Sequence, residues 1–197
     1  MKKLLLAVTM LFATSSFAGI LIEPQLGYSL GGGYSGSYTI SGVGSANTNF
    51  TYSGVSLGGR LGYQMLGLMT GLNYAMTSGT STCKSCSPNV DVDYSKNDLG
   101  VFVGYNFPIL LRAWVAYNFS SKMTFNQNVG SFHDGDYYKG KSTEIGVGFT
   151  GFPFLSINAI YRMHDLDESK SGSSTYTLSG LKPTDITLAV SAPFNLF

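Results

Sequence analysis

The sequence has few charged residues and few of the residues that build metal and redox sites. Asp, Glu, Lys and Arg make up 12% of the 197 residues, and there are two cysteines, two histidines and one tryptophan. Two cysteines are too few ligands for a structural zinc site, and we expect no metal and no cofactor. Lys and Arg number 12 against 11 Asp and Glu, so no basic field would attract nucleic acid.

Long apolar runs are also lacking, and the one short run lies near the amino terminus. Lys2 and Lys3 precede it, and small residues lead from it to Gly19. The run is well short of the roughly 20 apolar residues that a membrane-spanning helix needs. The pattern predicts a secretory signal peptide, residues 1–18, that is removed by cleavage. Residues 19–197 would then form one domain.

Glycine and aromatic residues are abundant instead, with 25 Gly, 13 Tyr and 13 Phe. In the stretch GYNFPILLRAWVAYNF, apolar side chains recur at alternate positions on both sides of Pro108. Successive side chains of a β-strand point to opposite faces, so this alternation predicts a hairpin with one apolar face. Pairing residues about Pro108 places Val103 opposite Ala113 and Phe102 opposite Trp114.

Two further hairpins have the same alternation. One places Glu144 opposite Arg162, and the other turns at Met65 and places Leu61 opposite Thr70. Alternating segments at both ends of the domain add two strands, which gives eight. These segments are residues 20–30 and 185–196. The connections between hairpins are long and rich in Gly, Ser, Asn and Asp. They span about residues 31–50, 77–92, 121–137 and 164–182.

Outward aromatic residues stand near both ends of the expected strands. They are Tyr28, Tyr63, Tyr74, Tyr105, Tyr117, Phe149, Tyr161 and Phe194. About 8 residues at about 3.3 Å each, in strands tilted by about 40°, would separate the two levels by roughly 20 Å. Outer-membrane barrels have an apolar band about 25 Å tall between two aromatic girdles. The sequence thus predicts an all-β fold, an eight-stranded antiparallel up-and-down transmembrane β-barrel.

The segment IEPQLGYSLG, together with the eight strands, resembles the small outer-membrane barrels of the OmpA and OmpX type, without the periplasmic domain of full-length OmpA-like proteins. The resemblance implies a monomer in the cell outer membrane, surrounded by lipid and lipopolysaccharide, with both termini in the periplasm. It also implies periplasmic chaperones and a barrel-assembly machinery that reads a terminal phenylalanine as its signal. Phe197 holds that position, although strict alternation from Phe194 and Leu196 puts it out of phase.

The inward phase of the predicted strands carries most of their charges. The inward residues are Glu23, Arg60, Asp98, Arg112, Glu144, Arg162 and Asp185, with the aromatic residues Phe102 and Trp114. An eight-stranded barrel is just wide enough for side chains to fill, so these charges must pair in a poorly solvated core. Three uses remain open: a structural ion network that plugs the lumen, a narrow path for small ions, and a pocket for an apolar solute as in OmpW-like barrels.

Candidate chemistry in the external connections is limited to two features. Cys83 and Cys86 lie in one connection, and because two cysteines outside the cytoplasm usually pair, we expect a disulfide. His133 and His164, each followed by an aspartate, lie in two other connections that could approach one another. Solvated polarity, cation binding and catalysis all remain open for them, and their spacing matches no catalytic signature.

The sequence therefore favours a non-enzymatic protein of the outer membrane, with a structural or surface-interaction role and loops that could hold an extracellular ligand. One alternative is a narrow channel or conduit for small ions or apolar solutes. The other is a surface hydrolase or acyltransferase that would use the loop histidines.

Overall fold

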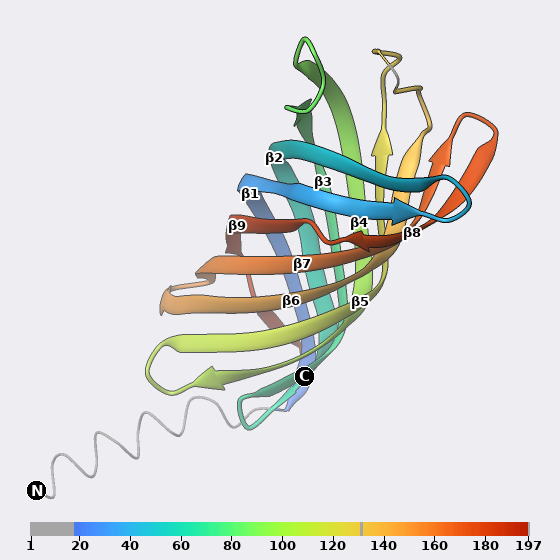
Figure 1. Ribbon diagram of the computed structural model, residues 1–197. Helices are drawn as coiled ribbons and strands as arrows, with labels where there is room; N and C mark the ends of the chain where they lie inside the picture. Colours follow the sequence, from blue (N-terminus) through green and yellow to red (C-terminus); the bar gives the residue numbers. More distant parts are fainter. Residues whose placement is uncertain (1–17, 131, 197) are drawn as a thin grey trace, which may run out of the picture.

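The computed structural model describes residues 18–130 and 132–196, which form antiparallel strands joined by turns (Figure 1). The strands are β1 Gly19–Ile40, β2 Gly44–Met65, β3 Leu68–Cys83, β4 Val90–Phe107, β5 Leu111–Phe125, β6 Tyr137–Phe152, β7 Leu155–Ser171, β8 Ser174–Leu181, β9 Thr184–Ser191 and β10 Phe194–Leu196. No helix among these residues is long and apolar enough to cross a membrane. Residues 1–17 of the expected signal peptide and Phe197, the expected assembly signal, lie outside the described residues.

The sheet closes into a barrel with eight strand positions. From β1 to β7, each strand pairs antiparallel with the next in the chain, and β9 pairs with both β7 and β1. The short strands β8, β9 and β10 share the eighth position, and all three pair with β1. The predicted eight-stranded up-and-down fold is thus confirmed. Closure leaves no open sheet edge, which in lipid would expose backbone groups that have no water to bind.

The hairpin registers depend on which residues fit the turns. The β6–β7 hairpin has the predicted register, with Glu144 opposite Arg162. The β4–β5 hairpin does not, because Val103 faces Val115, two residues away from the predicted partner. Proline favours the first central position of a turn, so Pro108 begins a three-residue connection instead of standing at its centre.

The β2–β3 register is also shifted by two residues from the predicted one. Leu61 faces Leu72 instead of Thr70. Leu66 and Gly67 both have positive φ angles, 52° and 83°, which is typical of the two-residue turns that match the twist of a hairpin. Because side chains alternate with a period of two, a shift of two residues leaves every inward and outward assignment unchanged.

Two of the connections predicted as long loops are instead extended hairpins. β1 and β2 continue to a turn at residues 41–43, and β7 and β8 meet at residues 172–173. They extend at the end of the barrel away from the carboxyl terminus (Figure 1). Apolar alternation does not reveal them because Ser and Thr replace the outward apolar residues, while inward Tyr34 and Tyr38 pack against an apolar cluster.

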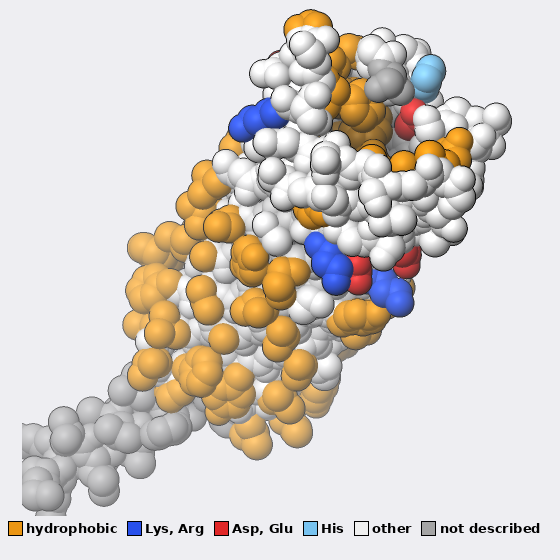
Figure 2. Space-filling model, viewed as in Figure 1, with side chains coloured by type: hydrophobic (Ala, Val, Ile, Leu, Met, Phe, Trp, Pro, Cys, Tyr) orange, Lys and Arg blue, Asp and Glu red, His pale blue; other side chains and the backbone are white. Residues whose placement is uncertain are grey.

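A belt of exposed apolar side chains surrounds the barrel on the side of the short turns (Figure 2). The eight predicted girdle residues point outward within it, each 40–48% exposed. They are Tyr28, Tyr63, Tyr74, Tyr105, Tyr117, Phe149, Tyr161 and Phe194. An exposed apolar surface of this extent indicates a membrane or protein contact, and its position on every side of a closed barrel indicates lipid.

Candidate functional site

The barrel interior contains all seven charged residues that are predicted to face it. They are Glu23, Arg60, Asp98, Arg112, Glu144, Arg162 and Asp185, and none is more than 3% exposed. Exposure this low keeps bulk solvent away from them. The charges are therefore neutralised by other side chains, in three groups along the barrel.

The first group centres on Glu23, close to the end with the short turns. Glu23 lies opposite Arg60 in the β1–β2 register, and Arg60 Nη2 is 3.1 Å from Glu23 Oε1. Arg112 Nη2 forms a second ion pair with the same oxygen. Arg112 Nη2 also donates to Asn158 Oδ1 at 2.8 Å and to Ser191 Oγ at 2.7 Å. One carboxylate thus joins two guanidinium groups from strands that are not neighbours, Arg60 in β2 and Arg112 in β5.

The second group centres on Glu144 and Trp114. Arg162 Nε donates to Glu144 Oε2 at 2.8 Å, and Trp114 Nε1 donates to Glu144 Oε1 at 2.8 Å. The Arg60 guanidinium lies 3.8 Å from the centroid of the Trp114 ring and 5.7 Å from that of Phe102. A cation over an aromatic face is attracted to it. The two predicted lumen aromatics therefore hold an arginine and a carboxylate in place.

The third group centres on Asp185, nearest the extended hairpins. Lys96 Nζ forms an ion pair with Asp185 Oδ2, and His164 Nε2 lies 2.9 Å from the same oxygen. Arg162 Nη1 is 3.4 Å from Asp185 Oδ1, and the Tyr52 hydroxyl is 3.4 Å from Oδ2. The guanidinium of Arg162 thus links this group to the second one.

Lys96 is absent from the predicted lumen charges, although the sequence contains the signal for it. Lys96 has the same even-numbered phase in β4 as Asp98 and Phe102, both of which are predicted to face inward. Lys96 lies in the first half of β4, close to residues 77–92, which are predicted as a loop. With Lys96 included, four cationic side chains face four carboxylates. They are Arg60, Lys96, Arg112 and Arg162 against Glu23, Asp98, Glu144 and Asp185.

The prediction that His164 lies in an external connection is wrong. His164 is an inward residue of β7 and only 3% exposed, so it cannot approach His133, which belongs to the segment between β5 and β6. The strand continues past His164, and Asp165 is the Cα partner of Lys141 on the outer face of β6 and β7. Among the described residues, no group of three or more His, Cys, Asp or Glu is arranged to hold a metal ion.

Ser121, His164 and Asp185 have the composition of a catalytic triad. Ser121 Oγ lies 3.0 Å from His164 Nδ1, and His164 Nε2 lies 2.9 Å from Asp185 Oδ2. A triad serine must reach a substrate carbonyl, but Ser121 is 1% exposed. The arrangement therefore satisfies buried polar groups and gives no access to a substrate.

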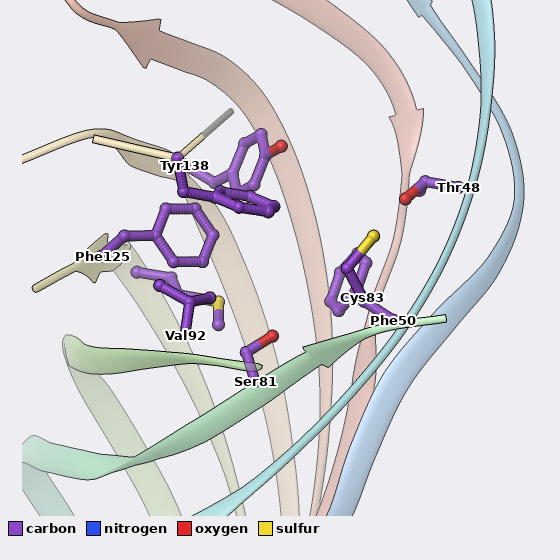
Figure 3. Close-up of a pocket in the computed structure, with 9 residues that line it drawn as sticks. Thr48, Phe50, Ser81, Cys83, Val92, Phe125 and Tyr138 are labelled. Atoms are coloured by element: carbon purple, nitrogen blue, oxygen red, sulfur yellow. The ribbon is translucent and has the colours of Figure 1, made fainter. Parts of the chain in front are cut away.

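Above the charged groups, the interior becomes apolar and then opens. Tyr52, Val92, Tyr94, Met123 and Phe125 form a buried cluster. A hollow lies on this cluster, and we name it and its open continuation the external cup. The hollow itself is lined by Thr48, Phe50, Ser81, Cys83, Val92, Met123, Phe125, Phe132 and Tyr138. In Figure 3, Phe125 and Tyr138 face Phe50 and Cys83 across the hollow.

The enclosed part of the external cup is small and its open part is large. The enclosed part holds about 30 Å³, enough for one or two water molecules. It continues into an open part of about 340 Å³, which shares Phe125, Phe132 and Tyr138 with it. The Phe125 ring centroid lies 4.8 Å from that of Phe132 and 5.7 Å from that of Tyr138. The cup thus offers aromatic surface to a molecule that arrives from the open end.

Sequence reasoning does not find the external cup because residues 121–137 are predicted as a loop. In β5 a bulge between Asn118 and Ser121 moves the inward phase from even-numbered to odd-numbered residues, so Met123 and Phe125 face inward against the phase of Arg112 and Trp114. Tyr138, in contrast, continues the even-numbered inward phase of Glu144 in β6.

A disulfide and a backbone contact brace one side of the external cup. Cys83 and Cys86 form the predicted disulfide, and Cys83 lines the hollow. The backbone N–H groups of Lys84 and Ser85 donate to the Asn49 carbonyl oxygen at 2.8 Å and 3.2 Å. The β3–β4 connection is therefore attached to β2.

Asp136 braces the other side by joining two external segments. Its carboxylate accepts hydrogen bonds from the Gly172 N–H at 2.7 Å and from the His133 N–H at 3.1 Å. Burial alone would raise the pKa of Asp136, but the hydrogen bonds from Gly172 and His133 outweigh it and hold the pKa below its usual value. The segment before β6 is thus fastened to the β7–β8 turn by an ionised carboxylate.

Comparison with known proteins agrees with this architecture. The sequence matches the outer membrane protein beta-barrel domain family over residues 4–194. No curated protein sequence matches the chain significantly.

Three solved structures of outer-membrane proteins have the same fold. OprG of Pseudomonas aeruginosa is 12% identical, with 92% of this chain and 99% of OprG covered and a TM-score of 0.57. Ail, the attachment invasion locus protein of Yersinia pestis, was solved in complex with the heparin analogue sucrose octasulfate. It is 13% identical, with 89% of this chain and 99% of Ail covered and a TM-score of 0.51. AlkL, solved in lipid bilayers, is 16% identical, with 90% of this chain and 91% of AlkL covered and a TM-score of 0.51.

These identities are low, so the likeness concerns the fold alone, whereas the family match extends over almost the whole chain. The apolar belt, the closed sheet and the family agree on the location of the protein. The chain belongs to the outer membrane protein beta-barrel domain family, and the membrane that it crosses is the cell outer membrane.

Proposed function

We propose that this protein is a non-enzymatic outer-membrane barrel whose external cup binds an apolar group of a molecule outside the cell, while its lumen stays sealed. The observation that carries the proposal is the contrast between the two parts of the interior. The lumen charges are at most 3% exposed and pair with one another. The cup above them has an aromatic floor, and its open part is lined by both apolar and polar side chains.

The sealed lumen argues against a conducting path. Trp114 and Arg112 are among the largest fully buried side chains, and both stand across the barrel interior. Moving an ion past them would separate charge pairs in a medium of low dielectric constant, which costs several kcal/mol per ion. The purified protein in planar bilayers should therefore show no conductance steps. Steps that disappear in Arg112→Ala would overturn the sealed lumen.

Ligand binding in the external cup can be tested through the methionine methyl groups. Met123 is in the cup, Met69 is in the lumen, and three others lie on the lipid-facing surface. The three are Met65, Met76 and Met163. With toluene titrated into lipid nanodiscs, the Met123 methyl resonance should shift and saturate, and the Met69 resonance should not move. Toluene dissolved in the bilayer would shift the lipid-facing resonances without saturation.

Two phenylalanines provide a matched pair of variants. Phe132 contacts Phe125 in the cup, with ring centroids 4.8 Å apart, and Phe152 contacts Phe149 on the outer surface, with centroids 5.7 Å apart. Phe132→Ala should weaken the saturable shift of Met123, whereas Phe152→Ala should leave it unchanged. Equal effects of the two variants, or no saturable shift in the unmodified protein, would contradict the proposal.

A further inference from the structure

Three lysines lie together on the outer face of the barrel, where the apolar belt ends. Lys122 belongs to β5, and Lys139 and Lys141 belong to β6. In β6 the outward phase runs from Ile145 through Thr143 to these two lysines. Figure 2 shows basic side chains beside acidic ones at the edge of the belt, and since all three arginines are buried, these basic side chains are lysines. The edge is on the side of the extended hairpins, which in outer-membrane barrels is the external side.

Lys122 and Lys139 are direct neighbours across β5 and β6. They are Cα partners in the register, and Lys122 Nζ lies 4.3 Å from the Tyr137 ring centroid. Like charges directly opposite one another on paired strands are destabilising. The pair is therefore a cost to the fold unless an anion lies between the two ammonium groups.

The acidic residues nearby do not supply that anion. On its other side Lys122 faces Asn97, and Lys139 faces Glu168. Glu168 Oε1 accepts a hydrogen bond from the Tyr137 hydroxyl at 2.8 Å. Within the described part of the chain, no ion pair of 4.0 Å or less involves Lys122 or Lys139. Apart from the Tyr137 ring beside Lys122, the described residues thus offer the two ammonium groups no paired anion.

We propose that Lys122 and Lys139 form a binding site for the phosphate group of a lipid in the outer leaflet, the phosphorylated headgroup of lipopolysaccharide. Phe119 precedes Lys122 on the outer face of β5, and Ile145 follows Lys141 and Thr143 on the outer face of β6; both are about half exposed. A lipid bound here has its anionic group between the lysines and its acyl chains along this apolar surface. A free anion would contact the two lysines but not the apolar residues. Lysine binds phosphate as a compact point charge.

The test compares two double variants that each remove two positive charges. The site variant is Lys122→Gln with Lys139→Gln, and the control is Lys84→Gln with Lys182→Gln, which lie in the β3–β4 and β8–β9 connections. Each protein is placed in phosphatidylcholine nanodiscs that contain bisphosphorylated lipid A as a minor component. Native mass spectrometry then measures how much lipid A each barrel retains.

The site variant should bind lipid A roughly thirtyfold more weakly, since each lysine near an anionic membrane surface contributes about fivefold. The control should retain lipid A as the unmodified protein does. Lys122→Arg with Lys139→Arg keeps both charges and should restore retention, which separates the loss of the site from a folding defect. Equal retention by the site and control variants would overturn the proposal. So would equal retention of a lipid A that lacks phosphate, or full displacement by inorganic phosphate.

Discussion

Glu144 accepts hydrogen bonds from Trp114 and Arg162 at the same time, each at 2.8 Å and each on a different carboxylate oxygen. The three residues come from β6, β5 and β7, so this carboxylate ties together three adjacent strands inside the barrel. All three are at most 2% exposed. Loss of one partner therefore leaves a charge that water cannot reach.

Arg162→Ala should lower the free energy of unfolding by about 3 to 5 kcal/mol, because it leaves Glu144 and Asp185 without their shared cation. The midpoint of urea unfolding in lipid vesicles measures this change. Lys141→Ala on the exposed face of β6 is the control and should barely move the midpoint. An unchanged midpoint for Arg162→Ala would show that the pair does not hold the fold together.

Lys96→Met should destabilise the barrel by about 3 kcal/mol, because it removes the fourth cation of the lumen and leaves Asp185 with excess negative charge around it. Adding Asp185→Asn to Lys96→Met should recover part of the loss, since both charges of the pair are then gone. The same urea midpoints measure both variants. A double variant less stable than the sum of the two single changes would contradict this account.

The inward or outward position of side chains could be predicted from the sequence, whereas many of their partners could not. Alternation with a period of two places Arg112 and Trp114 inside whatever the register, because a slip of two residues preserves the face. The register itself depends on turn geometry. Leu66 and Leu110 adopt left-handed φ angles, which leucine rarely does, so the sequence does not indicate these turns. Contacts such as Arg112 with Glu23 form only when the sheet closes, across 89 residues of sequence.

The external cup could not be predicted for a related reason. Alternation was a reliable guide only where lipid requires apolar outward residues, and beyond the belt the outward positions are mostly polar, such as Ser, Thr, Lys and Asp. Thr48, Cys83, Phe125 and Tyr138 are far apart in the sequence and meet only because β2, β3, β5 and β6 extend past the membrane.

The Asp136 contact with the β7–β8 turn should be stable at neutral pH and open only in strong acid. Because hydrogen bonds from Gly172 and His133 lower the pKa of Asp136 in the folded protein, its stabilising effect is fully present above the unfolded value of about 3.9. The effect is lost as the pH falls through the lower folded pKa. The amide proton shift of Gly172, followed by NMR from neutral to acidic pH, should therefore titrate with a midpoint below about 3.9.

Asp136→Asn is the control for this titration, because an amide side chain has no charge to lose over the same range. Its Gly172 shift should stay constant with pH. A midpoint at or above the ordinary value in the unmodified protein would mean that burial, and not hydrogen bonding, determines the charge state of Asp136.

Gly146→Ala should destabilise the barrel by about 1 to 3 kcal/mol, because the Trp114 indole ring lies directly on this glycine. A methyl group at position 146 would overlap the ring and push it away from Glu144 and from the Arg60 guanidinium, so that one change would disturb two charged groups. Gly31→Ala is the matched control, since nothing lies within 4 Å of a methyl group there. Tryptophan fluorescence reports on the same event, because Trp114 is the single tryptophan of the chain. A Gly146→Ala barrel with an unshifted emission maximum and the stability of Gly31→Ala would mean that the indole ring does not depend on the space that Gly146 provides.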